Sequence, residues 1–281
     1  MSSTRRVRVV TDSASDIPLH VREELGIRVV PLSLNFENES LLDTIDINAQ
    51  QYLDRLRADA KLPSTAQPSV DQFVQVFQQE LDADLDVVCF TLSAGLSGTY
   101  NAARLAAEQI DSKRLYVVDS RGATMQQGWT VIEAARWAEG GASALEVIAV
   151  GEAAIPKCFT FAVLQTLDYV HKGGRIGRVG HLVGSALGVK PVVGFADGVL
   201  VPYERVRTWK KALKRAIELA SSKGNALDIA VLHADNLADA RMVEAELRTI
   251  FPNANYLVDW AGPTITTYAG PGAIGIMIRV A

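Results

Sequence analysis

Cysteine and histidine are scarce in this sequence, whose 281 residues include two cysteines and four histidines. Cys89 and Cys158 each lie in an apolar run (VVCFTL and KCFTF), so we expect two buried free thiols, as in a protein of a reducing compartment, and no disulfide. The histidines are scattered, and neither H-E-x-x-H nor C-x-x-C occurs. The sequence therefore predicts no metal site and no cofactor.

Long apolar runs and an excess of positive charge are also missing. No run approaches the roughly 20 apolar residues that a membrane-spanning helix needs, and the segment VRVVTDSASD near the start lacks the apolar core of a signal peptide. Lysine and arginine number 28 against 32 aspartates and glutamates, for a net charge of −4. This balance offers no general attraction for nucleic acid, and we expect a cytoplasmic protein without a nucleic-acid partner.

Three familiar enzyme motifs are absent or misplaced. The stretch GPGAIG matches G-x-G-x-x-G, but it ends six residues before the last residue, which leaves no room for the helix and strand of a dinucleotide site. No G-x-x-x-x-G-K-[ST] occurs, so no P-loop is present. Ser97 stands in GLSG rather than in G-x-S-x-G, and no histidine has a reason in the sequence to lie beside it.

The first part of the chain alternates short β-branched runs with helical patterns, and the composition, at 48% hydrophobic, can fill a large core. Such alternation predicts βαβ units and a mainly parallel sheet. We expect strands at 6–10, 27–36, 86–92 and 114–119, and helices at 18–25, 48–58, 70–81, 98–110, 123–138 and 143–154.

The pattern changes after residue 155. KPVVGF and VLVPYERV flank Ala196, Asp197 and Gly198, which predicts a hairpin. Helices at 167–172, 210–221 and 238–250 and the strands IAVLHA, NYLVDW and AIGIMIRV complete the second part. The predicted fold class is therefore α/β with two domains, an N-terminal parallel-sheet domain over residues 1–155 and a C-terminal mixed α/β domain over residues 156–281.

Polar side chains follow three predicted strands where each strand ends, in VVTDSAS, FTLSAGLSG and VVDSRG. The carboxyl ends of parallel strands share one edge of a sheet, so these turns should meet at one crevice. For any single turn, helix capping explains the same residues equally well. Three such turns together favour a binding crevice, and the loop LPSTAQPSV adds Thr65 to it.

The stretch TLSAGLSGTYNAA crowds hydroxyls and glycines where a strand passes into a helix. Helix N-termini with unpaired N–H groups hold anions. Basic side chains gather elsewhere, and Arg175 and Arg207 stand in turns, where a guanidinium can face a phosphate or the carboxylate of a partner. Lys214 and Arg215 fit the solvated face of a helix.

Eight motifs, in this order over nearly the whole chain, resemble those of the DegV family of bacterial fatty-acid-binding proteins: VTDSASDIP, STAQPSV, LSAGLSGTYNAA, VVDS, KGGRIG, KPVV, ERVRTWKKA and TTYAGPGAIG. The resemblance implies two α/β domains with a long-chain fatty acid buried between them. It also implies a carrier without catalysis of its own. Some members present the lipid to a separate fatty acid kinase, which makes an acyl phosphate for phospholipid synthesis.

The resemblance assigns roles to individual residues. It places the fatty-acid carboxylate at Thr65 and at the turn from Ser93 to Thr99, with Ser97 as the first contact and Ser93 as the second. Tyr268 stands where many kinase-coupled members have a histidine, and its hydroxyl can still donate a hydrogen bond. Arg175 and Arg207 match arginines that face the kinase. Membrane contact would be transient, for lipid exchange only.

Two other functions remain open at this point. An enzyme could use the crevice, with Asp12 and Asp119, to act on a small phosphorylated or acyl substrate. A regulatory protein could sense lipid through a partner docked on Arg175 and Arg207.

Overall fold

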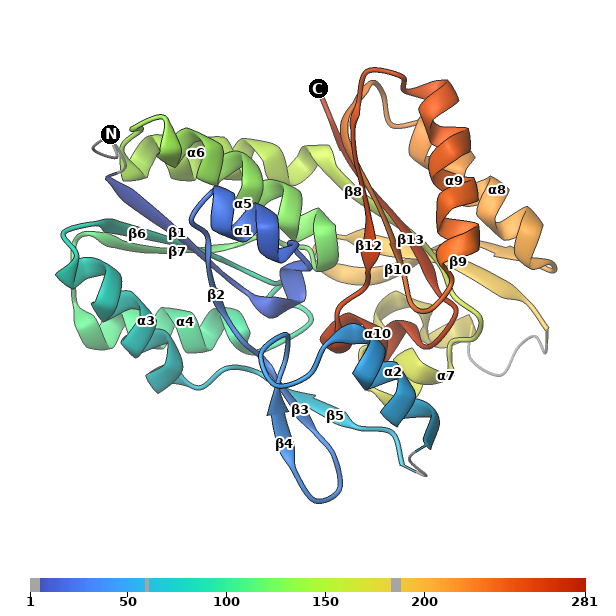
Figure 1. Ribbon diagram of the computed structural model, residues 1–281, viewed down its shortest axis with the longest axis horizontal. Coiled ribbons are helices and arrows are strands. Elements are labelled where there is room, and N and C mark those ends of the chain that lie inside the picture. Colours follow the sequence, from blue (N-terminus) through green and yellow to red (C-terminus); the bar gives the residue numbers. More distant parts are fainter. Residues whose placement is uncertain (1–5, 59–60, 183–187) are drawn as a thin grey trace.

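The computed structural model describes residues 6–58, 61–182 and 188–281, and it shows a mixed α/β protein built on two large sheets (Figure 1). The first sheet is parallel throughout and consists, in spatial order, of β2 (Arg28–Val30), β1 (Val7–Asp12), β6 (Asp86–Thr91) and β7 (Leu115–Asp119). The second sheet is mixed and consists, in spatial order, of β10 (Val199–Val206), β9 (Lys190–Ala196), β8 (Cys158–Val163), β13 (Ile274–Val280), β11 (Ala226–His233) and β12 (Asn255–Trp260). The predicted α/β class with a parallel and a mixed sheet is confirmed.

Helices cover both faces of the parallel sheet, as the first view shows (Figure 1). One face carries α3 (Val70–Asp82) and α4 (Thr99–Ile110), and the other carries α5 (Thr124–Glu139) and α6 (Ala144–Ala154), with the short α1 (Leu19–Glu24) beside α5. Helix α3 begins at a capping box formed by Ser69 and Gln72. Its buried Phe73 and Phe77 then anchor it to the sheet.

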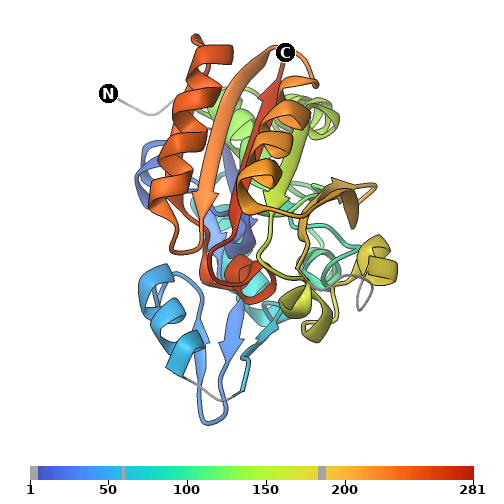
Figure 2. The same ribbon diagram turned by 90° about the vertical axis from the view of Figure 1, so that its right-hand side faces the viewer.

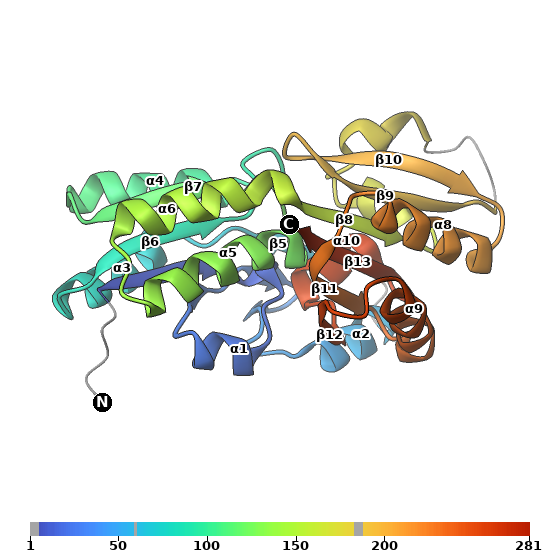
Figure 3. The same cartoon turned by 90° about the horizontal axis from the view of Figure 1, so that it is seen from above.

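Two long helices cover the outer face of the mixed sheet, and α5 packs against part of its inner face. In Figure 2, α8 (Trp209–Ser221) and α9 (Leu237–Ile250) lie in front of its strands. Side chains of β8 alternate, so that Phe159, Phe161 and Val163 pack toward these helices. Thr160 and Ala162 consequently face the other way, toward the parallel-sheet half, which lies beside the mixed sheet in Figure 3. Helices α7 (Asp168–Lys172) and α10 (Pro263–Ala269) lie at one end of the sheet.

The chain passes from one sheet to the other between α6 and β8, close to the predicted boundary at residue 155. One apolar cluster spans both sheets, since it contains Phe90 of β6 and Met277 of β13. The indole of Trp129 on α5 also donates a hydrogen bond to the Met277 carbonyl at 3.1 Å. The two halves therefore share a packed interface, and their division into independent domains stays a prediction.

The expected strand at 27–36 is wrong, because the structure divides it in two. Pro31 has no N–H to continue the ladder, so β2 ends at Val30 and the chain leaves the parallel sheet. It then forms a small antiparallel sheet of β4 (Ser40–Leu42), β3 (Ser33–Asn35) and β5 (Ser64–Ala66), with α2 (Ala49–Ala58) beside it. Helix α2 of this segment contacts α10, where the Tyr52 and Thr267 hydroxyls lie 2.6 Å apart.

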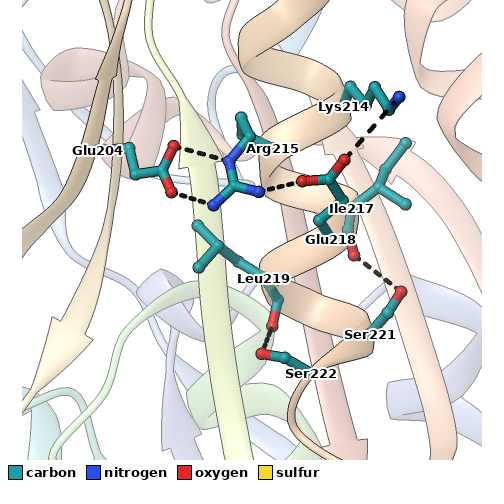
Figure 4. A network of polar contacts seen from close by, with 8 residues as sticks. All are labelled: Glu204, Lys214, Arg215, Ile217, Glu218, Leu219, Ser221 and Ser222. Carbon is teal, nitrogen blue, oxygen red and sulfur yellow. Dashed lines mark hydrogen bonds and ion pairs between the residues drawn. The ribbon is translucent and has the colours of Figure 1, made fainter.

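Charges on α8 are paired along the solvated face of the helix (Figure 4). Arg215 contacts Glu204 of β10 and Glu218, and Lys214 lies 4.0 Å from Glu218. The hydrogen bond from Arg215 lowers the pKa of Glu204. Exposed pairs of this kind add little to stability, so these residues fit the structural role predicted for them.

Both cysteines are buried free thiols, as predicted. Burial raises the pKa of the Cys89 thiol well above its usual value and that of Cys158 to about 12. Neither thiol is therefore poised to act as a nucleophile at neutral pH.

Candidate functional site

A cavity lies between the inner face of the mixed sheet and the turns that follow the parallel strands. It holds about 1010 Å³ of space free of protein atoms, including the space at its open end. Most of its wall is apolar, and among the residues that form it are Leu92, Leu164, Val193, Phe195, Leu232 and Met277. A space of this size and character suits a largely apolar small molecule.

Small residues on the strands keep the cavity open. Ala162 of β8, Gly194 of β9 and Gly275 of β13 all line it. A β-carbon placed on Gly194 would lie 2.0 Å from the Thr160 carbonyl oxygen, so no larger residue fits there without moving the backbone. The close approach of β8 and β9 at this point therefore requires glycine.

Four polar residues, Thr65, Ser97, Arg175 and Tyr268, line the same cavity, and we call this group the polar end. The Thr65 and Tyr268 hydroxyls lie 2.5 Å apart. Ser97 Oγ lies 2.9 Å from Thr99 Oγ1. Because the Arg175 side chain is exposed, the polar end reaches the protein surface.

Each residue of the polar end comes from a different element. β5 carries Thr65, the turn before α4 carries Ser97, and α10 carries Tyr268. Ser97 Oγ also accepts a hydrogen bond from the Thr99 backbone N–H at 3.3 Å, at the start of α4. The structure thus brings together three of the residues predicted to contact a carboxylate, while that contact itself stays a prediction.

Arg175 lies at the polar end as well as at the surface predicted to face a partner. Its Nε donates to the Leu96 carbonyl at 3.2 Å, and its Nη1 donates to the Gly173 carbonyl at 3.0 Å. Its guanidinium carbon lies 5.3 Å from the centre of the Tyr268 ring. These contacts hold the positive charge of Arg175 beside the hydroxyls of the polar end. The sequence did not indicate this position for Arg175.

Ser93 and Arg207 lie apart from the cavity. Ser93 Oγ donates to the Gly198 carbonyl at 2.6 Å and accepts from the Gly95 N–H at 3.1 Å, so it joins the turn before α4 to the β9–β10 hairpin. This contact differs from the predicted contact with a carboxylate. Arg207 is exposed directly after β10 and is not among the residues that line the cavity.

A hollow of about 640 Å³, including the space open to solvent, adjoins the polar end and shares Leu96, Ser97 and Arg175 with the cavity. Its other walls come mainly from glycines of the two turns that meet here, Gly95, Gly98, Gly174 and Gly177. Backbone without side chains therefore faces this hollow, beside the N-terminus of α4.

The aspartates of the predicted crevice hold turns together. Asp12 is fully buried and accepts hydrogen bonds from the Leu92 N–H at 2.7 Å and the Ala14 N–H at 3.1 Å. Asp119 accepts from the N–H groups of Ala94 and Arg121. Neither carboxylate lines the cavity, so the structure does not place the acids that the enzyme alternative invoked in contact with a ligand there.

Two further carboxylates stand directly behind the cavity wall. Asp43 accepts hydrogen bonds from Thr264 at 2.5 Å and from Ser13 at 2.8 Å, and Asp16 accepts one from Thr124 at 2.7 Å. Burial raises the pKa of Asp43 to about 6 and holds the pKa of Asp16 well above its usual range. Their hydroxyl partners Thr264 and Thr124 both line the cavity.

Sequence reasoning missed α10 and the threonines of the cavity wall. Helix α10 begins at Gly262-Pro263, with Pro263 in its first turn, which is a recognisable helix start. The alternation in CFTFAV would have placed Thr160 on the same face of a strand as Cys158. Thr124 and Thr264 carry no comparable pattern in the sequence.

Within residues 6–58, 61–182 and 188–281, no group of three or more histidine, cysteine, aspartate or glutamate side chains is arranged to hold a metal ion. In the same part of the chain, every helix is too short or too polar to cross a membrane.

Comparisons with known proteins agree with this architecture. A family model described as "Uncharacterised protein, DegV family" matches residues 6–280. A DegV domain-containing protein of Caldanaerobacter subterraneus subsp. tengcongensis is 35% identical over 277 residues, which cover 98% of this chain and 99% of that protein.

Solved structures are also similar. A DegV family protein of Thermus thermophilus, described as binding fatty acid, superposes with a TM-score of 0.89 at 31% identity and covers 98% of this chain and 100% of its own. DegV of Bacillus subtilis, described as a fatty-acid-binding protein, gives a TM-score of 0.89 at 30% identity, with 99% and 100% covered.

Proposed function

The chain belongs to the DegV family, and from this membership and the cavity we propose that it is a carrier that binds one long-chain fatty acid. The observation that carries the proposal is a large apolar cavity that ends at hydroxyls and one arginine. Relatives of the same fold are described as fatty-acid-binding proteins.

The acyl tail would lie along the inner face of the mixed sheet. Burial of each methylene group is worth about 0.8 kcal/mol, so a long chain can outweigh the cost of ordering it. The tail would therefore supply most of the affinity, and the carboxylate would fix the orientation.

The carboxylate would lie at the polar end, with Thr65, Ser97 and Tyr268 as hydrogen-bond donors. Arg175 would add charge, although two of its donors are already bonded to carbonyls. We do not retain Ser93 as a contact, since its hydroxyl proton is used by the Gly198 carbonyl. Its role would be to hold the turn that carries Ser97 against the second half.

We further propose that the bound lipid is presented to a separate fatty acid kinase in the cytoplasm. The exposed polar end would make the carboxylate accessible from outside, and the adjoining glycine-lined hollow offers room beside it. Arg207 and the exposed side of Arg175 would contact the kinase. The chain would supply no catalysis, since the buried Asp12 is committed to backbone N–H groups.

Native mass spectrometry of the purified protein tests the proposal. We expect an added mass equal to that of a long-chain fatty acid, released on denaturation and identified by lipid analysis. A protein that carries no lipid and fails to take up stearic acid, yet turns over a small phosphorylated substrate, would favour the enzyme instead.

The double variant Thr65→Ala/Ser97→Ala tests the head-group contacts. Hydrogen bonds to a charged group are each worth about 1.5–3 kcal/mol, so we expect stearic acid to bind about 100-fold or more weakly. Affinity would be measured by displacement of a fluorescent fatty acid. Ser64→Ala, on the same strand as Thr65 but outside the cavity lining, is the control and should bind normally. Unchanged affinity in the double variant would contradict the assignment.

A further inference from the structure

One hydroxyl in the apolar wall has no hydrogen-bond partner. Thr160 Oγ1 is buried, and no donor or acceptor of the described residues contacts it, although the residue lines the cavity. Buried polar groups are nearly always paired, and an unpaired hydroxyl lowers stability. Valine has the same shape and suits a strand equally well, so neither packing nor strand formation calls for this oxygen.

The other hydroxyls of the cavity wall are all engaged. Thr124 donates to Asp16, and Thr264 donates to Asp43. At the polar end, Thr65 contacts Tyr268 and Ser97 contacts Thr99. Within the described residues, Thr160 is therefore the one lining hydroxyl that has no hydrogen-bond partner at all.

Thr160 lies away from the polar end. Leu164, just beyond β8, belongs to the apolar cluster that includes Ile176, the neighbour of Arg175. Thr160 precedes Leu164 by four residues, which is about 13 Å along an extended strand. It pairs instead with Met277, whose side chain belongs to the deep cluster shared by the two halves. A ligand anchored at the polar end would bring the distal part of its chain to Thr160.

Small residues surround Thr160 on the cavity side of the sheet. Ala162 and Gly275, which have little or no side chain, line the cavity on the same face of the sheet as Thr160. A hydroxyl on the ligand could both donate to and accept from Thr160 Oγ1.

We propose that the cavity is adapted to hydroxylated fatty acids, and that Thr160 hydrogen-bonds a hydroxyl group in the distal part of the acyl chain. This inference rests on the proposed function, because it requires the carboxylate at the polar end. Thr160 would select among fatty acids by the substituent they carry, while the surrounding apolar wall would bind the rest of the chain.

Binding of stearic acid and of monohydroxystearic acids with the hydroxyl at successive chain positions tests the inference. One net hydrogen bond predicts that the wild-type protein binds at least one hydroxylated acid about 2- to 10-fold more tightly than Thr160→Val does. Thr160→Val should bind stearic acid at least as well as the wild type. Thr160→Ser keeps the hydroxyl and should keep the preference.

The outcomes separate the two proposals. The inference is wrong if the wild-type protein binds stearic acid more tightly than every hydroxylated acid and Thr160→Val ranks the acids in the same order. In that case Thr160 pairs with a buried water only. That comparison can be made on the wild-type protein even if a variant fails to fold. If no acid binds, stearic acid included, the proposed function fails and this inference fails with it.

Discussion

Replacement of Ala162 by phenylalanine is expected to weaken fatty-acid binding severely. Ala162 lines the cavity from β8, where it is paired with Gly275 and Val193. A benzyl group at this position would occupy space that the acyl tail needs. If the ring displaces about four methylene groups, about 3 kcal/mol of binding free energy is lost, which lowers the affinity for stearic acid about 100-fold or more.

Ala83→Phe is the matched control, because it adds the same side chain at an exposed residue after α3. It should retain stearic acid as the wild type does, in both displacement titrations and native mass spectra. Thermal unfolding followed by circular dichroism would show that Ala162→Phe still folds. Normal binding by a folded Ala162→Phe variant would mean that the tail lies elsewhere.

The free energy of unfolding is expected to decrease as the pH rises from about 4 to about 6. Burial raises the pKa of Asp43 from its usual 3.8 to about 6, although hydrogen bonds from Thr264 and Ser13 offset part of this effect. In this range the folded protein holds a proton that the unfolded chain releases, so the stabilisation by that proton is lost as the pH rises. Asp43 alone would contribute a decrease of up to about 3 kcal/mol.

Asp43→Asn should remove that contribution, so urea unfolding at a series of pH values would show a shallower decline than in the wild type. Burial also raises the pKa of Asp12 to about 7, so part of the decline should remain. Asp54→Asn, an exposed residue of α2, is the control and should follow the wild-type curve. Parallel curves for wild type and Asp43→Asn would show that Asp43 is not protonated in the folded protein.

Local patterns predicted most of the regular elements. Apolar periodicity placed α3 within one residue of its observed bounds. The Asp-Gly pair placed the hairpin of β9 and β10, whose turn has Gly198 at a φ of +75°. These signals succeed because each arises within a few neighbouring residues.

Errors occurred where a proline inside a run was overlooked and where a distant contact decides the structure. The run at 27–36 has the composition of one strand, yet Pro31 ends β2, and β3 pairs with strands of a separate sheet. The single strand of three residues that carries Thr65 gives no pattern of its own, because it is held by pairing with β3. Such short strands depend on partners that the local sequence does not reveal.

The candidate site was also predicted only in part from the sequence. The motifs identified Thr65, Ser97 and Tyr268 as members of one site, and they indicated the family before any coordinates. They ranked Ser97 before Ser93, which lies four residues earlier in the same turn, but kept both as contacts of the carboxylate. Only the structure shows that Ser93 contacts Gly198 while Ser97 lines the cavity.

By itself, the sequence determined the fold class, the order of most elements, the burial of both thiols and the family, because these follow from local periodicity and ordered motifs. The tertiary structure alone decided the cavity, the place of Arg175 beside Tyr268 and the unpaired hydroxyl of Thr160. The physical reason is that a cavity is formed by side chains from strands and turns more than a hundred residues apart. Its shape and its free hydrogen-bonding groups exist only once those elements have packed together.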